Sequence, residues 1–224
     1  MMRLRALLPV IVLSATAVLT GCASSRSNLP DEWDGLVRQP HSRLQAVFVK
    51  PDAEIPAYRN VKLDPVEVSF ARNWEPNRGG RSQVSRLDSG DVEAIRTNVA
   101  DLFRETLRTE LARGGYQLVD EAGPDTLRVT AAVVDLYITA PDTMSAGRSR
   151  TYTADAGRMT LVAELRDSVT GEILARAVDT RSARTTGQMS WTNRVTNTAD
   201  ARRAMTVWAT ALRQALDEFY GKAK

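Results

Sequence analysis

Few residues in this chain of 224 are of types that carry out nucleophilic or metal chemistry. His41 is the only histidine, and a catalytic triad or a histidine metal site needs partners that one imidazole does not supply. We therefore expect His41 to be an exposed bystander, and we expect no metal and no dissociable cofactor. Gly79 and Gly80 lack the lysine and the strand-to-helix spacing of a phosphate-binding loop.

Asp135 and Asp179 are the candidate acid–base residues, because both fall inside segments that we predict to be strands. An inward-facing carboxylate there would have a raised pKa suited to proton transfer. A sugar-hydrolysing dyad needs its carboxyl groups about 5 to 10 Å apart in a cleft. We favour the plainer alternative, in which each aspartate points outward or pairs with a neighbouring arginine. The arginines in reach are Arg128, Arg176 and Arg181.

Cys22 is the only cysteine, and it directly follows a secretory leader. Arg3 and Arg5 precede an apolar run from Ala6 to Leu19, which is shorter than the roughly 20 residues of a membrane-spanning helix. The sequence Leu-Thr-Gly-Cys at 19–22 resembles the bacterial lipobox, in which the thiol is acylated and becomes the first residue after cleavage. We predict a lipoprotein signal peptide over residues 1–21 and lipidation at Cys22. A free buried cysteine is the alternative.

Acyl chains on Cys22 would hold the protein on a bilayer without a segment that crosses it, since stable anchoring takes about two hydrophobic signals. By the same resemblance, three chains are expected. Ala23 stands where an aspartate would favour retention in the inner membrane, so we predict the outer membrane, with the protein facing the periplasm. Acylation would also exclude a cysteine nucleophile.

Charge and cysteine content exclude two further classes of protein. Cleavage removes Arg3 and Arg5 from the 30 basic residues, which leaves 28 against 27 acidic residues. This balance, without a polybasic block, argues against nucleic-acid binding. With no second cysteine, packing alone must hold the fold.

Two polar loops contain the candidate contacts for a partner. Residues 71–87 hold Trp74 among arginines that include Arg78 and Arg81, and residues 184–198 hold Trp191. Arginine could contact phosphate or an acidic partner, and tryptophan is enriched at interfaces. The alternatives are a solvated loop for the arginines and packing on the sheet for Trp191.

Hydrophobic periodicity predicts one α+β domain over residues 41–224, behind a lipidated, flexible tether over residues 22–40. Apolar residues recur at helical spacing after Asp88, as far as Gly114, and again from about Thr198 to Tyr220. A short apolar run over residues 44–51 is stopped by Pro51, and strands are predicted around Pro65, over 126–139, and as an antiparallel hairpin over 158–183. Two amphipathic helices need a sheet face to cover, so we expect a two-layer sandwich with a mostly antiparallel sheet.

Several segments, in the order of the chain, resemble the proteobacterial lipoproteins grouped as domain of unknown function 3313. They are YRNVKLDPVEVSF, GGYQLVDEAGPDTLRVTAAVVDL, DSVTGEILARAVDTR and ARRAMTVWATALRQALDE. The resemblance covers roughly residues 40–220 and implies an envelope lipoprotein of unestablished function, with no catalytic residues.

These observations predict a non-enzymatic lipoprotein that binds an envelope protein or a cell-wall component. One alternative is a carboxylate-dependent hydrolase that acts on cell-wall or lipid material through Asp135 or Asp179. Another is a structural part of an efflux or secretion assembly. The sequence leaves the oligomeric state open.

Overall fold

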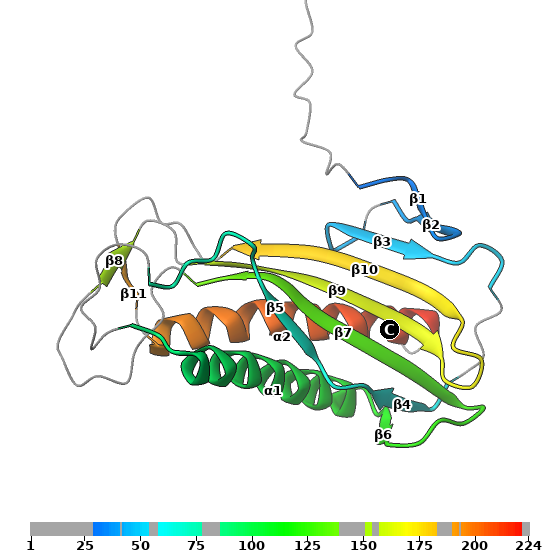
Figure 1. Ribbon diagram of the computed structural model, residues 1–224. Coiled ribbons are helices and arrows are strands. Elements are labelled where there is room, and N and C mark those ends of the chain that lie inside the picture. The colour runs from blue at the N-terminus through cyan, green and yellow to red at the C-terminus, as the bar shows by residue number, and fades with distance from the viewer. Residues whose placement is uncertain are drawn as a thin grey trace, which may run out of the picture.

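The computed structural model describes residues 29–40, 42–53, 58–77, 86–138, 151–153, 157–182, 190–192 and 194–220. Within these residues a nine-stranded sheet carries two long helices on one face (Figure 1). The predicted two-layer α+β architecture is confirmed.

The strands are β1 (Glu32–Trp33), β2 (Leu36–Arg38), β3 (Ala46–Val49), β4 (Asn60–Leu63), β5 (Glu67–Phe70), β6 (Gln117–Val119), β7 (Thr126–Tyr137), β8 (Thr151–Thr153), β9 (Arg158–Asp167), β10 (Ile173–Ser182) and β11 (Ser190–Thr192). The helices are α1 (Ser89–Arg113) and α2 (Arg194–Phe219).

The sheet is mostly antiparallel, as predicted, and becomes parallel toward one edge. Its strand order is β1-β2-β3-β10-β9-β7-β4-β6, and β5 also pairs with β7. The pairs β4–β6, β4–β7 and β5–β7 are parallel, while the pairs from β1 across to β7 are antiparallel. Pro65 separates β4 from β5, so a single predicted strand is two short ones. Helix α1 supplies the crossover that parallel pairing requires between β5 and the strands that follow.

Helix α1 lies where capping and periodicity predict it. Asp88 is the N-cap, and its side chain accepts a hydrogen bond from the Asp91 backbone while the Asp91 side chain accepts one from the Asp88 backbone. The helix ends at Arg113, before Gly114 and Gly115. Helix α2 starts at Arg194, earlier than the predicted start near Thr198.

The main core lies between the helices and the inner face of the sheet, which we define as the face that carries Val133 and Leu161. Phe103 of α1 and Trp208 of α2 pack there with their ring centroids 5.6 Å apart. A second cluster, around Leu111 and Leu127, continues the core toward the end of α2. Both helices therefore bury their apolar stripes against one face, as expected for amphipathic helices.

The predicted tether over residues 22–40 is wrong for its second half. Residues 32–38 form a hairpin, β1–β2, that extends the sheet beyond β3. Asp34 and Gly35 make its two-residue turn with φ values of 52° and 77°, which suits an Asp-Gly turn of type I′. Trp33 and Leu36 pack against Phe48 in a third apolar cluster, so this segment belongs to the fold.

Part of the predicted polar loop over residues 184–198 also forms structure, because it contains β11 and the start of α2. β8 and β11 pair as a separate two-stranded sheet with Trp191 opposite Tyr152. In Figure 1 this small sheet lies at the end of the molecule where both helices begin.

Candidate functional site

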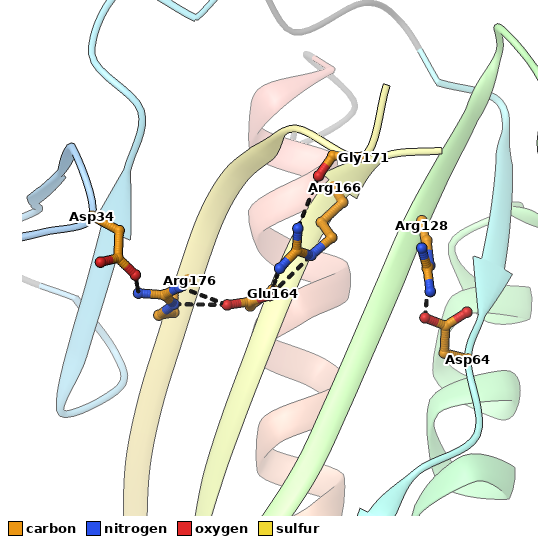
Figure 2. A network of polar contacts seen from close by, with 7 residues as sticks. All are labelled: Asp34, Asp64, Arg128, Glu164, Arg166, Gly171 and Arg176. Atoms are coloured by element: carbon orange, nitrogen blue, oxygen red, sulfur yellow. Dashed lines mark hydrogen bonds and ion pairs between the residues drawn. The ribbon is translucent and has the colours of Figure 1, made fainter. Parts of the chain in front are cut away.

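A network of charged side chains lies on the outer face of the sheet, opposite the helices (Figure 2). Register places Arg128 opposite Arg166 on neighbouring strands, and Glu164 opposite Arg176. These side chains share one face, because residues at alternate positions along a strand point to the same side. The face also carries Thr130, Ala132, Val134, Thr160, Val162, Val178 and Thr180.

Glu164 is the centre of the network, and both of its carboxylate oxygens are fully used. Oε1 of Glu164 lies 2.8 Å from Nε of Arg176, which donates a hydrogen bond to it, and 2.7 Å from Nη2 of the same guanidinium. Oε2 receives Nε and Nη2 of Arg166 at 2.9 and 2.5 Å. The remaining Nη1 of Arg166 donates to the carbonyl of Gly171 in the turn that follows β9. Each guanidinium therefore places two nitrogen atoms against a single carboxylate oxygen, and hydrogen bonds between charged groups are stronger than those between neutral groups.

Arg176 links the network to the N-terminal hairpin. Its Nη1 donates to Oδ2 of Asp34 at 2.8 Å, and its guanidinium lies 4.3 Å from the ring centroid of Trp33. The Arg176 side chain is only 7% exposed, whereas that of Asp34 is 60% exposed. A buried guanidinium needs such partners to compensate for lost hydration. The arrangement therefore fastens the hairpin over the outer face.

The electrostatics of the network make Glu164 unsuitable for acid–base chemistry. Burial acts to raise the pKa of Glu164, but the hydrogen bonds and charges of Arg176 and Arg166 outweigh it and hold the pKa below its ordinary value. A carboxylate with a lowered pKa and four donors has neither a proton to give nor a vacant lone pair. The network is built to hold strands and hairpin together.

Arg128 has a carboxylate partner of its own. Its Nε donates to Oδ2 of Asp64 at 2.7 Å, across the parallel pair of β4 and β7. Like charges directly opposite each other on a sheet are destabilising. Arg128 and Arg166 avoid that cost because each pairs with a different carboxylate.

Asp179, one of the two predicted acid–base residues, is buried on the inner face. Its carboxylate accepts hydrogen bonds from the backbone of Gln45 at 2.9 Å, from Nε1 of Trp208 at 2.7 Å and from Nε of Arg181 at 2.5 Å. The predicted pairing with Arg181 is confirmed. Asp179 therefore links β10 to the residue before β3 and to α2, and its role is structural.

Asp135, the other predicted residue, is exposed and sits at an irregularity of β7. The registers of β5–β7 and β7–β9 both shift there, and Asp135 has φ of 52°. The residue behaves as the extra residue of a bulge, which lets Val133 and Leu136 both reach the core. Asp135 and Asp179 lie on strands that β9 separates, and their environments do not make a paired site.

Two tyrosine–carboxylate pairs brace the end of the fold where α2 finishes. The hydroxyl of Tyr58 donates to Asp167 at 2.8 Å, and that of Tyr116 donates to Asp217 at 3.0 Å. Burial first, and then the adjacent carboxylate, raises the pKa of each phenol. The backbone of Thr170 and the Tyr58 hydroxyl lower the pKa of Asp167. Both phenols therefore act as neutral donors.

The predicted partner contacts are placed only in part. Trp74 is half-buried: its ring stacks on Phe70 with centroids 4.1 Å apart, and its Nε1 donates to the Ile138 carbonyl at 3.0 Å. Trp191 is placed by its backbone in β11. His41, Cys22, Arg78 and Arg81 lie outside the described residues.

Sequence reasoning assigned the network arginines to the wrong carboxylates. Arg128 and Arg176 are among the three arginines expected within reach of Asp135 and Asp179, whereas Arg128 pairs with Asp64, and Arg176 pairs with Asp34 and Glu164. The turn at 168–171 indicates that β9 and β10 pair, but Glu164 lies opposite Arg176 only because the register shifts between Ile173 and Ala175. In the part of the chain that the structure describes, no group of three or more potential metal ligands occurs.

The family model described as protein of unknown function, DUF3313, matches residues 25–212. No curated protein matches the chain.

Three solved structures resemble this chain at low sequence identity, with TM-scores below 0.5. PelC from Paraburkholderia phytofirmans, described as a dodecamer, is 13% identical with a TM-score of 0.38, and the match covers 75% of this chain and 96% of that one. A minor lipoprotein from Acinetobacter baumannii is 12% identical with a TM-score of 0.35, covering 73% and 95%. Protein XCC0632 from Xanthomonas campestris is 16% identical with a TM-score of 0.38, covering 78% and 94%.

Proposed function

We propose that this chain, which belongs to the DUF3313 family of proteins of unknown function, is a lipid-anchored protein of the bacterial outer membrane. In this proposal its α+β domain faces the periplasm and binds another envelope component without catalysing a reaction. The observation that carries the proposal is the Leu-Thr-Gly-Cys sequence at 19–22, directly after an apolar leader.

The folded part of the chain begins only a few residues after Cys22, and this supports the proposal. The described chain is already fixed at Leu29, whose carbonyl accepts a hydrogen bond from Nη1 of Arg38 at 3.2 Å. A domain held this close to its anchor is confined near a surface. Confinement raises its effective concentration toward partners on the same membrane, so a weak interface is sufficient.

The placement of the carboxylates supports the non-catalytic part of the proposal. Asp179 accepts three hydrogen bonds, and Glu164 lies between two guanidinium groups. Asp135 is exposed at a bulge. A hydrolytic dyad needs one carboxyl group with a raised pKa beside an ionised one, and no described contact favours that alternative.

No helix among the described residues is long and apolar enough to cross a membrane.

Metabolic labelling with radioactive palmitate tests the anchor. We expect wild-type protein to incorporate label and C22S to incorporate none, because serine offers no thiol for diacylglyceryl transfer. A23D is expected to move the labelled protein to the inner-membrane fraction, while A23S, a change of similar size, leaves it in the outer membrane. Equal labelling of wild type and C22S would contradict the proposal.

Crosslinking in cells tests the binding role. A photoreactive residue is placed at Trp191, in β11, or at Asp101, an exposed position in the middle of α1. We expect one defined adduct at position 191 that disappears in C22S, because the loss of the anchor removes the local concentration. An adduct pattern that is the same at both positions and unaffected by C22S would indicate random collision and contradict a specific partner.

A further inference from the structure

The point where the fold begins restricts how an anchored domain sits on its membrane. Leu29 packs against the cluster of Leu36, Ala46 and Phe48. Nη1 of Arg38 donates a hydrogen bond to the carbonyl of Leu29 at 3.2 Å, and the backbone N–H of Arg38 donates one to the carbonyl of Asp31 at 2.9 Å. The chain is therefore tied to the sheet from Leu29 onward.

The hairpin that carries Leu29 is itself fastened to the outer face. Trp33 meets Phe48 edge-on with centroids 5.7 Å apart, and Asp34 bonds to the buried Arg176. Because Trp33 and Leu36 form one cross-strand pair and point inward, the neighbouring pair of Glu32 and Val37 points outward. Figure 1 shows the hairpin on the side of the sheet opposite α1 and α2.

The chain between Cys22 and Leu29 is short relative to the domain. Residues 22–28 span at most about 25 Å when fully extended, and a relaxed flexible chain of that length spans about 15 Å. Helix α1 alone, with 25 residues, is about 37 Å long. The tether is thus shorter than the object that it holds.

We propose that the outer surface of the β1–β2 hairpin, marked by Glu32 and Val37, faces the headgroup surface of the bilayer, and that α1 and α2 face away from it. This inference rests on lipidation at Cys22 in the proposed function. Turning the helices toward the bilayer would place the hairpin behind the sheet and the helix layer, each helix being about 10 Å thick. Residues 22–28 would then be stretched toward their full length, which lowers the entropy of the chain.

The consequence concerns which surface of the domain stays open to the periplasm. With the hairpin side against headgroups, the helix layer is presented to the periplasm. The inference thereby deepens the proposed function, since it names the bilayer as the occupant of the hairpin side.

Quenching by lipids tests this orientation. Val37 on the hairpin and Val207 on α2 are matched probes, because they are the same residue type with 42% and 43% exposure. The full chain with its leader is expressed as V37C or V207C. Acylation occupies the sulfur of Cys22, so the new cysteine is the only thiol that reacts with a fluorescent maleimide. The mature protein is reconstituted in phosphatidylcholine vesicles that contain a headgroup nitroxide lipid.

We expect the probe at position 37 to be quenched at least about twofold more than the probe at position 207, given a relaxed tether of about 15 Å. Insertion of about 20 Gly/Ser residues after Asn28 is expected to bring this ratio close to one, since the relaxed span then approaches about 29 Å. Vesicle-bound protein with equal or reversed quenching at the native tether length would overturn the inference and leave the proposed function standing. Protein that does not stay with vesicles would overturn both.

Discussion

A carboxylate held between two arginines stabilises a sheet only while it is ionised, and Glu164 is in that position. E164Q keeps the shape of the side chain but removes its charge, so that of the two carboxylates paired with the buried Arg176 only Asp34 remains. We expect the free energy of unfolding at pH 7 to fall by about 3 kcal/mol, measured by urea denaturation. E172Q is the matched control: Glu172 pairs with Lys50 in an exposed contact, so its loss is expected to stay below about 1 kcal/mol.

The lowered pKa of Glu164 also sets the pH dependence of this contribution. Because the folded pKa lies below the ordinary value of 4.5, the stabilisation is complete above that value and is lost as the pH falls through the folded pKa. Wild type should therefore lose more stability than E164Q between neutral pH and acid. Parallel curves for the two proteins would show that Glu164 is not the group that titrates.

Asp135 illustrates a backbone requirement rather than a chemical one. Its φ of 52° is tolerated by aspartate, causes no steric strain for glycine and is sterically unfavourable for a β-branched residue. We expect D135G to match wild type within about 0.5 kcal/mol and D135V to lose about 1 to 2 kcal/mol, measured by thermal unfolding. Equal loss in both variants would assign the role to the carboxylate instead of the bulge.

At the scale of elements, α1 offers a matched pair of aspartates. Asp88 caps the helix and takes part in a reciprocal capping box, while Asp101 is exposed in its middle. D88A is expected to lower the free energy of unfolding by about 1 kcal/mol, and D101A by less than about 0.5 kcal/mol. Urea denaturation of both variants measures these free energies of unfolding. A larger decrease for D101A than for D88A would contradict the assignment of Asp88 as the cap.

The elements that sequence predicts are those with long periodic patterns or strong turn signals. Helix α1 has an apolar stripe between a cap and a Gly-Gly end, and β9–β10 has the turn at 168–171. The β1–β2 hairpin was missed because strands of two and three residues show no period, although Asp34-Gly35 between apolar residues is a hairpin signal.

The polar network was harder to foresee than the elements that carry it. The pairing of Glu164 with Arg176 depends on a register that shifts between Ile173 and Ala175. A shift of one residue moves every side chain of a strand to the other face. The parallel pairing of Asn60 with Thr126 was equally hidden, because α1 separates the two strands in sequence and no local pattern marks their contact.

At the scale of the molecule, the strands differ in how well their neighbours protect them. β9 lies between β7 and β10, and its inner side chains contact the helix core. The hairpin β1–β2 lies at the end of the sheet and is held by one small apolar cluster and the contacts of Arg176. Local openings have lower free energies where fewer buried contacts must break.

Native-state hydrogen exchange across a urea series tests this difference. Amides of β9 should exchange only through global unfolding, whereas those of β2 should open at a lower free energy that depends little on urea. D34N removes the charge that Nη1 of Arg176 contacts, and exchange in β2 is expected to become faster by up to about tenfold, since complete loss of a hydrogen bond to a charged group costs about 1.5 kcal/mol. Exchange in β9 is expected to change only as far as the global free energy of unfolding changes. If β2 instead tracked β9 in both proteins, the hairpin would be part of the single cooperative unit, and the membrane-facing side would be as rigid as the core.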